Sequence, residues 1–301
     1  MNTFSWRADR AFLNAWPSLS GITHHHWQAR FAGGLSRRAN SVNPLGAHAT
    51  LCDADIRFFE NACRAQNLPL VVRVPALLDA DVDGMLARSG FAREGDCCVL
   101  HGVLAQAAGG PDSAVSIDEA ASREWFDAIH AAQDRAHDQR AVYEAIINAI
   151  ALPAGFLTLR EKNEPVALAY GAIDGDLLCV ESVVTGPSHR GKGYAKRLMA
   201  AILRWGKARG AQTACLQVEM SNAPALALYR GIGLGGELYR YHYRRQIQGT
   251  REAAKVGIES AKAGRPLAAI ESAIESASNG VRRWVTEYRL ASSSQMQLNA
   301  R

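Results

Sequence analysis

One stretch of the chain, residues 183–197, constrains the fold more than any other. It reads V-V-T-G-P-S-H-R-G-K-G-Y-A-K-R, an apolar strand followed by a glycine-rich basic turn and the start of an amphipathic helix. Gly191 and Gly193 remove side chains where the chain turns, so several backbone N–H groups can point into one concavity at the positive end of the helix. Four basic side chains add charge around this turn: Arg190, Lys192, Lys196 and Arg197. The sequence therefore predicts a strand–turn–helix unit that binds a diphosphate.

Two common nucleotide-binding motifs do not match this turn. A P-loop places Lys and then Ser or Thr directly after a second glycine, and the order here is different. The dinucleotide fingerprint G-x-G-x-x-G needs an early place in a βαβ unit and a third glycine, which G-K-G-Y-A-K lacks. The remaining pattern is Arg/Gln-x-x-Gly-x-Gly/Ala, and Arg190, Gly193 and Ala195 match it.

A second motif follows downstream of the turn. The segment L-Q-V-E-M-S-N-A-P-A-L-A-L-Y-R-G-I-G-L, residues 216–234, predicts a strand over Leu216 to Val218 and a short helix from Ala223 to Arg230. Asn222 is a good N-cap for this helix, and Pro224 is tolerated in its first turn. The motif consists of Asn222, Ala225, Leu228, Tyr229, Gly233 and Leu234. In this order and spacing, the two motifs resemble those of the GNAT superfamily of N-acetyltransferases.

The resemblance implies a fold, a co-substrate and a set of contacts. The fold class is α/β (α+β), with mixed β-sheet units flanked by helices, and the co-substrate is acetyl-CoA. In GNAT enzymes the strand before the glycine turn splays away from the next strand, and the pantetheine arm of the cofactor fills the gap. By resemblance, backbone groups of Val183, Val184 and Thr185 contact this arm, and one N–H faces the thioester oxygen. The pyrophosphate is expected on Arg190, Gly191, Lys192, Gly193, Tyr194 and Ala195.

Acetyl transfer from a thioester to an amine sets further requirements. The ammonium must lose a proton, the carbonyl must be polarised and the leaving thiolate must be stabilised or protonated, while both substrates are held in line. No covalent enzyme intermediate is required, so no Ser or Cys nucleophile is expected. By resemblance, the Tyr229 hydroxyl is the acid towards the thiolate, and its alternative role is an aromatic core residue. Asn222 is expected near the pantetheine arm, a place compatible with its role as helix N-cap.

The general base is expected among two glutamates and two histidines. Glu181 lies in a largely apolar strand, and alternation would put its side chain on the face of Val183, opposite to Ser182. Burying a carboxylate in such a strand costs free energy unless the group has a catalytic role or an interaction partner. Glu181 is therefore the first candidate, acting directly or through water. The other candidates, in order, are Glu219, then His137 and His189. An ordered water chain would make a single essential base unnecessary.

The chain is predicted to hold two related units in tandem. A strand, a helix, a glycine and an apolar residue over 70–91 match the same order over 214–234. In place of the glycine turn the first copy has N-P-L-G-A-H, residues 43–48, which should not hold a diphosphate well. The predicted segments are a degenerate GNAT-like domain over 1–105, a linker over 106–113, a catalytic GNAT domain over 114–246, and a helical, partly disordered tail over 247–301. This layout resembles tandem-GNAT proteins whose N-terminal copy is degenerate.

Local patterns in the first copy predict further elements. Trp27 to Phe31 and Leu35 to Val42 are predicted strands around the Gly33–Gly34 turn, a hairpin signal. Asp53 is the predicted N-cap of a helix to about Gln66. The run His24–His26 is expected to be a polar turn before a strand, although it could bind metal adventitiously. No metal is expected as a cofactor, since no Cys/His spacing predicts zinc.

The composition and charge of the chain indicate which ligands, partners and compartment to expect. The hydrophobic content of 48% supports real cores, and the net charge of +5 with a pI near 9.0 suits an anionic ligand such as coenzyme A. No basic stripe with interleaved aromatic residues is visible, so nucleic acid is not an expected partner. The six cysteines form no C-x-x-C pair and are expected to be buried thiols in a reducing cytosol. No apolar run reaches membrane-spanning length and no signal-peptide core is visible, which predicts a cytoplasmic protein without a membrane partner.

Three functions fit these features. The first is an acetyl-CoA-dependent N-acetyltransferase that moves the acetyl group to the amine of a small molecule by direct attack in a ternary complex. The alternatives are a non-catalytic acyl-CoA-binding or sensing protein and a protein N-terminal or lysine acetyltransferase. The acetyltransferase of proteins would need an open peptide groove.

In the predicted tail, an amphipathic stripe could dock on this chain, on a second copy in a homodimer, or on nothing. The stripe consists of Val281, Trp284, Val285 and Tyr288.

Overall fold

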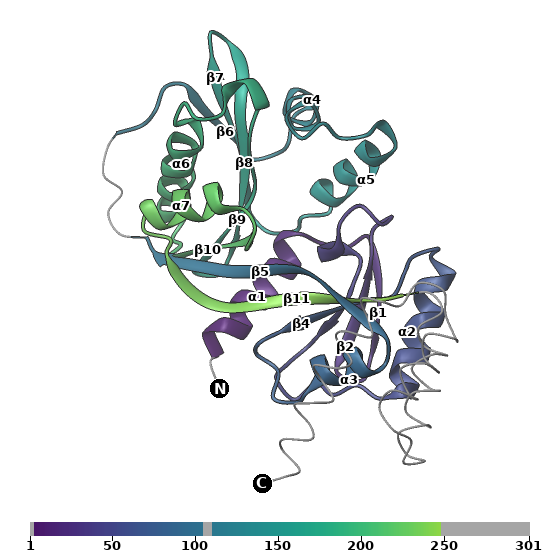
Figure 1. Cartoon of the computed structure of the whole chain (residues 1–301). Helices are drawn as coiled ribbons and strands as arrows, with labels where there is room; N and C mark the ends of the chain where they lie inside the picture. Colours follow the sequence, from purple (N-terminus) through teal and green to yellow (C-terminus); the bar gives the residue numbers. More distant parts are fainter. Residues whose placement is uncertain (1–2, 105–109, 248–301) are drawn as a thin grey trace, which may run out of the picture. The chain divides into compact units, whose positions relative to one another are not determined.

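The structure, a computed structural model, describes residues 3–104 and 110–247 (Figure 1). These residues divide into two compact units, each assembled from segments that are distant in sequence. The larger unit takes the residues of Met1–Gly21, Arg30–Asn40 and Asp96–Arg240. The smaller unit takes those of Ile22–Ala29, Ser41–Gly95 and the segment from Tyr241 onward. Residues 3–21 and 30–40 thus belong with the unit that carries the glycine turn.

A mixed sheet forms the centre of the larger unit, in the order β11-β5-β10-β9-β8-β7-β6. Its strands are β6 (Val115–Asp118), β7 (Ala154–Glu161), β8 (Glu164–Asp174), β9 (Leu177–Thr185) and β10 (Thr213–Glu219), with the parts of β5 (Phe91–Val103) and β11 (Gly236–Gln246) that lie within Asp96–Arg240. Strands β9 and β10 are parallel, whereas β10 pairs antiparallel with β5, and β8 pairs antiparallel with both β7 and β9. The predicted mixed α/β fold class is confirmed.

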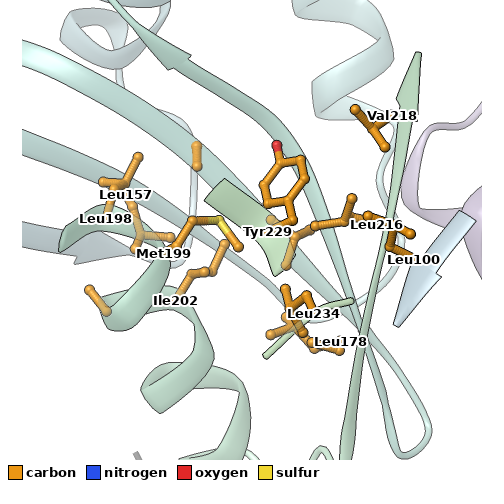
Figure 2. Packing of buried hydrophobic residues seen from close by; sticks show 14 of the residues in the cluster. Leu100, Leu157, Leu178, Leu198, Met199, Ile202, Leu216, Val218, Tyr229 and Leu234 are labelled. Carbon is orange, nitrogen blue, oxygen red and sulfur yellow. The ribbon is translucent and has the colours of Figure 1, made fainter. Parts of the chain in front are cut away.

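Two helices cover one face of this sheet, α6 (Tyr194–Ala208) and α7 (Ala223–Gly231). The apolar stripe of α6 includes Leu198 and Ile202, which are fully buried in one cluster with strand residues such as Leu178. Figure 2 shows these side chains together with Tyr229 of α7. Each fully buried Leu or Ile stabilises the fold by about 1.5–3 kcal/mol. This packing fixes the start of α6, and with it the glycine turn, against the sheet.

The other face of the sheet carries α4 (Arg123–Ala132) and α5 (His137–Asn148). Along β7 the side chains alternate, since Phe156 packs in the cluster of these two helices and Leu157 packs in the cluster of α6. Residues of α1 (Thr3–Ala15) and the following turn join the same side through Trp16, which packs with Tyr143 of α5. Buried side chains therefore cover both faces of this sheet.

The smaller unit contains a second set of strands and helices. Its elements are β1 (Ser20–His24), β2 (Trp27–Phe31), β3 (Val42–Pro44), α2 (Asp53–Ala65), β4 (Val71–Pro75) and α3 (Val82–Arg88). Strands β2 and β3 pair antiparallel, β3 and β4 pair parallel, and β4 pairs antiparallel with β11. Helix α2 buries Ile56, Phe59 and Cys63, and its N-cap is Cys52 and not the predicted Asp53.

The prediction of a strand over Leu35 to Val42 is wrong. Most of this segment is a loop around a short 3₁₀ helix, η1 (Arg37–Ala39). The side chain of Asn40 accepts hydrogen bonds from the backbone N–H groups of Ala32, at 2.7 Å, and Gly34, at 2.9 Å. A side chain that bonds nearby backbone groups in this way competes with strand pairing, and it closes the loop instead.

Some predictions fall on residues outside the described part of the chain. These are the first half of the linker, residues 106–109, and nearly all of the tail over 247–301 with its amphipathic stripe.

Among the described helices, none combines the length and the apolar character that crossing a membrane would require.

Candidate active site

The glycine turn has the backbone conformation that its sequence predicts. Gly191 and Gly193 have positive φ values of 76° and 80°, in the left-handed region that favours glycine. A Cβ atom at either position would meet nothing within 4 Å, so the turn is open. Gly193 is the N-cap of α6, and the helix dipole and unbonded N–H groups at that end favour an anion. The turn therefore meets the physical requirements of a diphosphate site.

The charged side chains around the turn are not equivalent. Arg190, Lys192 and Lys196 are exposed. Arg197 instead forms an ion pair with Asp112, with its Nε 2.8 Å from Oδ2 and its Nη2 2.9 Å from Oδ1. The hydrogen bonds from Arg197 lower the pKa of the Asp112 carboxyl group, so this partner stays ionised. The positive charge available to a diphosphate therefore comes from the first three side chains and not from Arg197.

Tyr194 contributes its backbone, and not its hydroxyl, to the turn. Its ring is buried at the start of α6, and its hydroxyl donates a hydrogen bond to Glu161 at the end of β7. This contact orients the first residue of the helix. Ala195 follows it as a small, half-buried residue.

Strands β9 and β10 pair with each other only over the first part of their length. Their parallel register runs from Leu177↔Thr213 to Val180↔Leu216 and ends there, while β9 continues to Thr185 and β10 to Glu219. Over this stretch β9 keeps its other neighbour, with Val184 opposite Leu168 of β8. The side of β9 that faced β10 can then accept an extended ligand as an added strand. The divergence expected next to Val183, Val184 and Thr185 is confirmed.

A β-bulge lies at the point of divergence. Ser182 has a φ of 53°, rare for a residue with a side chain, and the β8–β9 register shifts so that Ser182 and Val183 together face Ala169. The Tyr143 hydroxyl donates a hydrogen bond to the Ser182 Oγ at 3.2 Å. A buried tyrosine of α5 thus supports the strained position.

The bulge reverses the predicted direction of one side chain. The register places Glu181 opposite Tyr170 and Val184 opposite Leu168, so Glu181 and Val184 share a face. Val183 packs in the α6 cluster, whereas Val184 packs in the α4/α5 cluster. The expectation that Glu181 and Val183 share a face is therefore wrong, because the extra residue of the bulge shifts the alternation.

Glu181 has a partner that sequence reasoning missed. The Nη1 atom of Arg38 donates to both carboxylate oxygens of Glu181, at 2.8 Å and 2.6 Å, and lies 3.3 Å from Oε1 of Gln217. Glu181 follows the last paired residue of β9, and Gln217 follows the last paired residue of β10. Arg38 therefore joins the two strands where they part, and the ion pair offsets the burial of Glu181, which is 4% exposed.

The loop that carries Arg38 is held by a buried arginine. Arg30 is 3% exposed and donates to the backbone carbonyl of Arg38 at 2.8 Å and to those of Leu13 and Trp16 at 2.9 Å and 2.6 Å. The guanidinium of Arg38 lies 4.8 Å from the ring centre of Trp16. These contacts hold Arg38 in place.

The other candidate bases lie in different settings. Glu219, at the end of β10, pairs with Arg37 at 2.9 Å, and its side chain is 55% exposed. His189 lies in the short 3₁₀ helix η2 (Pro187–His189), with its Nδ1 3.8 Å from Glu161. His137 is an exposed residue at the start of α5. The structure thus brings the two glutamates, and not the two histidines, to the diverging strand ends.

Tyr229 is a buried residue of α7 whose ring packs in the cluster of Figure 2, with its hydroxyl directed away from Leu234. Burial raises the pKa of Tyr229 to about 12, and the negative charge of Glu181 adds to the rise. The hydroxyl is therefore protonated at neutral pH, and it is a weaker acid than an exposed tyrosine.

Asn222 has the capping role expected of it. Its side chain accepts a hydrogen bond from the backbone N–H of Ala225 at 3.2 Å, at the start of α7. The residue is exposed. Its place near a pantetheine arm stays a prediction.

Comparison with known proteins agrees with this geometry. The model of the family described as "Probable histone acetyltransferase Rv0428c C-terminal" matches residues 7–247, most of the chain. The chain belongs to this family. It is an N-acetyltransferase of the GNAT superfamily.

Relatives and solved structures support the same assignment. An uncharacterised N-acetyltransferase, YobR of Bacillus subtilis (strain 168), is 21% identical over 243 residues, which are 79% of this chain and 97% of that protein. A GCN5-related N-acetyltransferase from Kribbella flavida shares the fold with a TM-score of 0.60 at 16% identity, over 82% of this chain and 95% of that one. A tandem GNAT protein from the clavulanic acid biosynthesis pathway has a TM-score of 0.50 at 12% identity, over 64% and 69% of the two chains.

The site fits the acetyl-CoA that GNAT enzymes use. The open turn at Gly191 and Gly193 suits its diphosphate, and the end of pairing after Val180 leaves an edge for its extended arm. When bound, acetyl-CoA supplies the acetyl group as a thioester.

Proposed function

We propose that this GNAT enzyme acetylates the amine of a small molecule by direct attack in a ternary complex. The observation that carries the proposal is the placement of residues 30–40 at the diverging ends of β9 and β10. Arg38 bonds Glu181 and Gln217 there, and Arg37 bonds Glu219. Because this loop is bonded to both strands, it occupies space beside the strand ends. An extended peptide would have less room there than if the loop were elsewhere.

The cofactor contacts of this proposal follow the two halves of the site. The turn residues Arg190, Gly191, Lys192, Gly193, Tyr194 and Ala195 hold the diphosphate through backbone N–H groups and two basic side chains. The backbone of Val183, Val184 and Thr185 bonds the extended arm. Asn222, exposed at the start of α7, contributes to the same arm.

The proton transfers are assigned to two buried side chains. The amine nitrogen forms a bond to the acetyl carbon, and the bond from that carbon to sulfur breaks. Glu181 takes the proton that the ammonium loses before attack, directly or through water, and the second proton, which the nitrogen loses as the amide forms, passes to solvent. Arg38 Nη1 bonds both of its oxygens, yet a carboxylate has about four lone-pair positions, so two remain. Tyr229, protonated at neutral pH, gives its proton to the leaving sulfur.

A protein acceptor is the second candidate. The description of the family as probable histone acetyltransferases favours it. It requires an open groove beside the strand ends, and the loop with Arg37 and Arg38 would then have to move.

The direct test is release of free coenzyme A thiol on a panel of small primary amines and on histone-tail peptides, with the product identified by mass. We expect acetylation of a small amine. When both substrates are varied, double-reciprocal plots of the initial rate should give lines that intersect. Parallel lines would contradict direct attack, and acetylation of peptides alone would favour the second candidate. Gly193→Glu should abolish acetyl-CoA binding, because its side chain would fill the open turn. If the wild type bound acetyl-CoA and turned over none of these acceptors, a binding or sensing role would replace the proposal.

A further inference from the structure

Three potential metal ligands meet in the smaller unit. His24 ends β1, His25 lies in the turn before β2, and Asp55 is the third residue of α2. The Oδ1 atom of Asp55 lies 3.3 Å from Nε2 of His24 and 2.8 Å from Nδ1 of His25. One ligand atom from each residue lies within 4.8 Å of the others. Two imidazoles and a carboxylate from separate elements thus converge on one point.

The spacing matches that of a coordinated metal. Bonds of about 2.0 Å to zinc put neighbouring ligands of a tetrahedron about 3.3 Å apart. The distance from His24 to Asp55 equals that value, and the distance from His25 is 2.8 Å, so small side-chain movements would let an ion replace the hydrogen bond between His25 and Asp55. The side chain of His25 is 66% exposed, which gives an ion access and lets solvent complete its coordination.

Aromatic contacts hold the first imidazole in place. The ring of His24 stacks on Phe58 of α2, with ring centres 4.0 Å apart and planes 14° apart, and it contacts the ring of His25 at 4.1 Å. His25 itself has a positive φ of 48°. Such strain is found where the surrounding structure fixes a residue, and here it keeps the second imidazole beside the first.

We propose that His24, His25 and Asp55 form a binding site for a divalent transition-metal ion, with zinc as the expected occupant. Imidazole and carboxylate donors suit zinc, nickel and copper, and not the oxygen-only sites of calcium or magnesium. The bound ion would tie the β1–β2 turn to the N-terminus of α2. All three residues belong to the smaller unit, whereas the acetyl-transfer residues belong to the larger one, so the role is structural.

The test is calorimetric titration of zinc chloride into the full chain, prepared without a polyhistidine tag and stripped of metal. We expect one zinc per chain in the wild type and a rise in melting temperature with zinc. His25→Ala and Asp55→Asn should each weaken binding by at least about 10-fold. Because His25 is exposed, its variant is expected to fold even if loss of the Asp55 carboxylate loosens the start of α2.

The matched control is His26→Ala. His26 is the next residue of the same turn, is exposed, and is not one of the three clustered ligands. Its variant should bind zinc within about 2-fold of the wild type, since it removes no ligand. No binding by the wild type would overturn the proposal. So would a result in which His26→Ala loses as much affinity as His25→Ala while Asp55→Asn loses none, because the histidine run alone would then bind the ion adventitiously.

Discussion

The guanidinium of Arg38 donates to both oxygens of the Glu181 carboxylate, at 2.8 Å and 2.6 Å, across 143 residues of sequence. The pair sits where β9 and β10 stop pairing, and Gln217 of β10 shares the same guanidinium nitrogen. The loop with Arg38 therefore bridges the two strand ends from outside the segment that carries both GNAT motifs.

Removing Arg38 should destabilise the larger unit. Arg38→Ala leaves the buried carboxylate of Glu181 without its ion-pair partner. We expect a loss of about 2–4 kcal/mol in the free energy of unfolding, below the range for a fully buried pair because the side chain of Arg38 is 29% exposed. Urea denaturation measures this change.

Arg37→Ala is the matched control for that experiment. The neighbouring arginine pairs with Glu219, and this pair is largely exposed, so its loss should cost less than about 1 kcal/mol. Adding Glu181→Gln to Arg38→Ala should restore part of the lost stability, because no unpaired charge remains. Equal costs for the two arginine variants, with no recovery in the double variant, would show that the Arg38–Glu181 pair does not stabilise the fold.

Tyr229→Phe should reduce turnover and leave acetyl-CoA affinity nearly unchanged. The ring stays in the cluster of Figure 2, and only the proton donor is lost. General-acid catalysis contributes about 100-fold or more, so a fall of that order is expected. Thiol release gives the rate and calorimetry the affinity. An unchanged rate at saturating acetyl-CoA would remove Tyr229 from the chemistry.

Stability should fall steeply at alkaline pH. Burial raises the pKa values of Tyr229 and Tyr143 from 10.0 to about 12. Because the folded-state values are raised, the stabilisation is fully present below pH 10 and is lost as the pH rises from 10 to about 12. Each tyrosine should add about 1.4 kcal/mol per pH unit to the slope in this window. Denaturation at several pH values should show a shallower slope in Tyr229→Phe and Tyr143→Phe; identical slopes would contradict the role of burial.

Gly193→Ala and Gly210→Ala form a matched pair for the turn. Both glycines have a positive φ, 80° and 91°, and both have open space at the Cβ position, so each substitution should cost about 1–2 kcal/mol of stability from strain alone. Gly193 begins α6 and Gly210 follows its end, so only Gly193→Ala should weaken acetyl-CoA binding in calorimetry. An equal loss of affinity in both variants would argue against the turn as the diphosphate site.

The parts of the site that depend on local sequence could be predicted. The glycine turn is set by Gly191 and Gly193 themselves, and the helix cap by the hydrogen bond from Ala225 N–H to Asn222. Both effects act within a few residues, so the motif contains the physical cause.

The parts of the site that depend on contacts between residues far apart in the chain could not be predicted from the sequence. The only sequence signal for Arg38 is an arginine pair after two glycines, and its partner lies far along the chain. The bulge at Ser182 interrupts a run, V-E-S-V-V, that reads as a continuous strand, and the hydrogen bond that supports it comes from Tyr143 on helix α5. A one-residue shift of this kind reverses every later side chain, which is why the predicted direction of Glu181 relative to Val183 was wrong.

The most direct test of the account is amide hydrogen exchange of the full chain with and without saturating acetyl-CoA. Binding along β9 and in the glycine turn should slow exchange at Val183, Val184 and Thr185 and at residues 191–195. Exchange that slows only in other segments, or in none, would contradict the claim that these residues hold the acetyl donor.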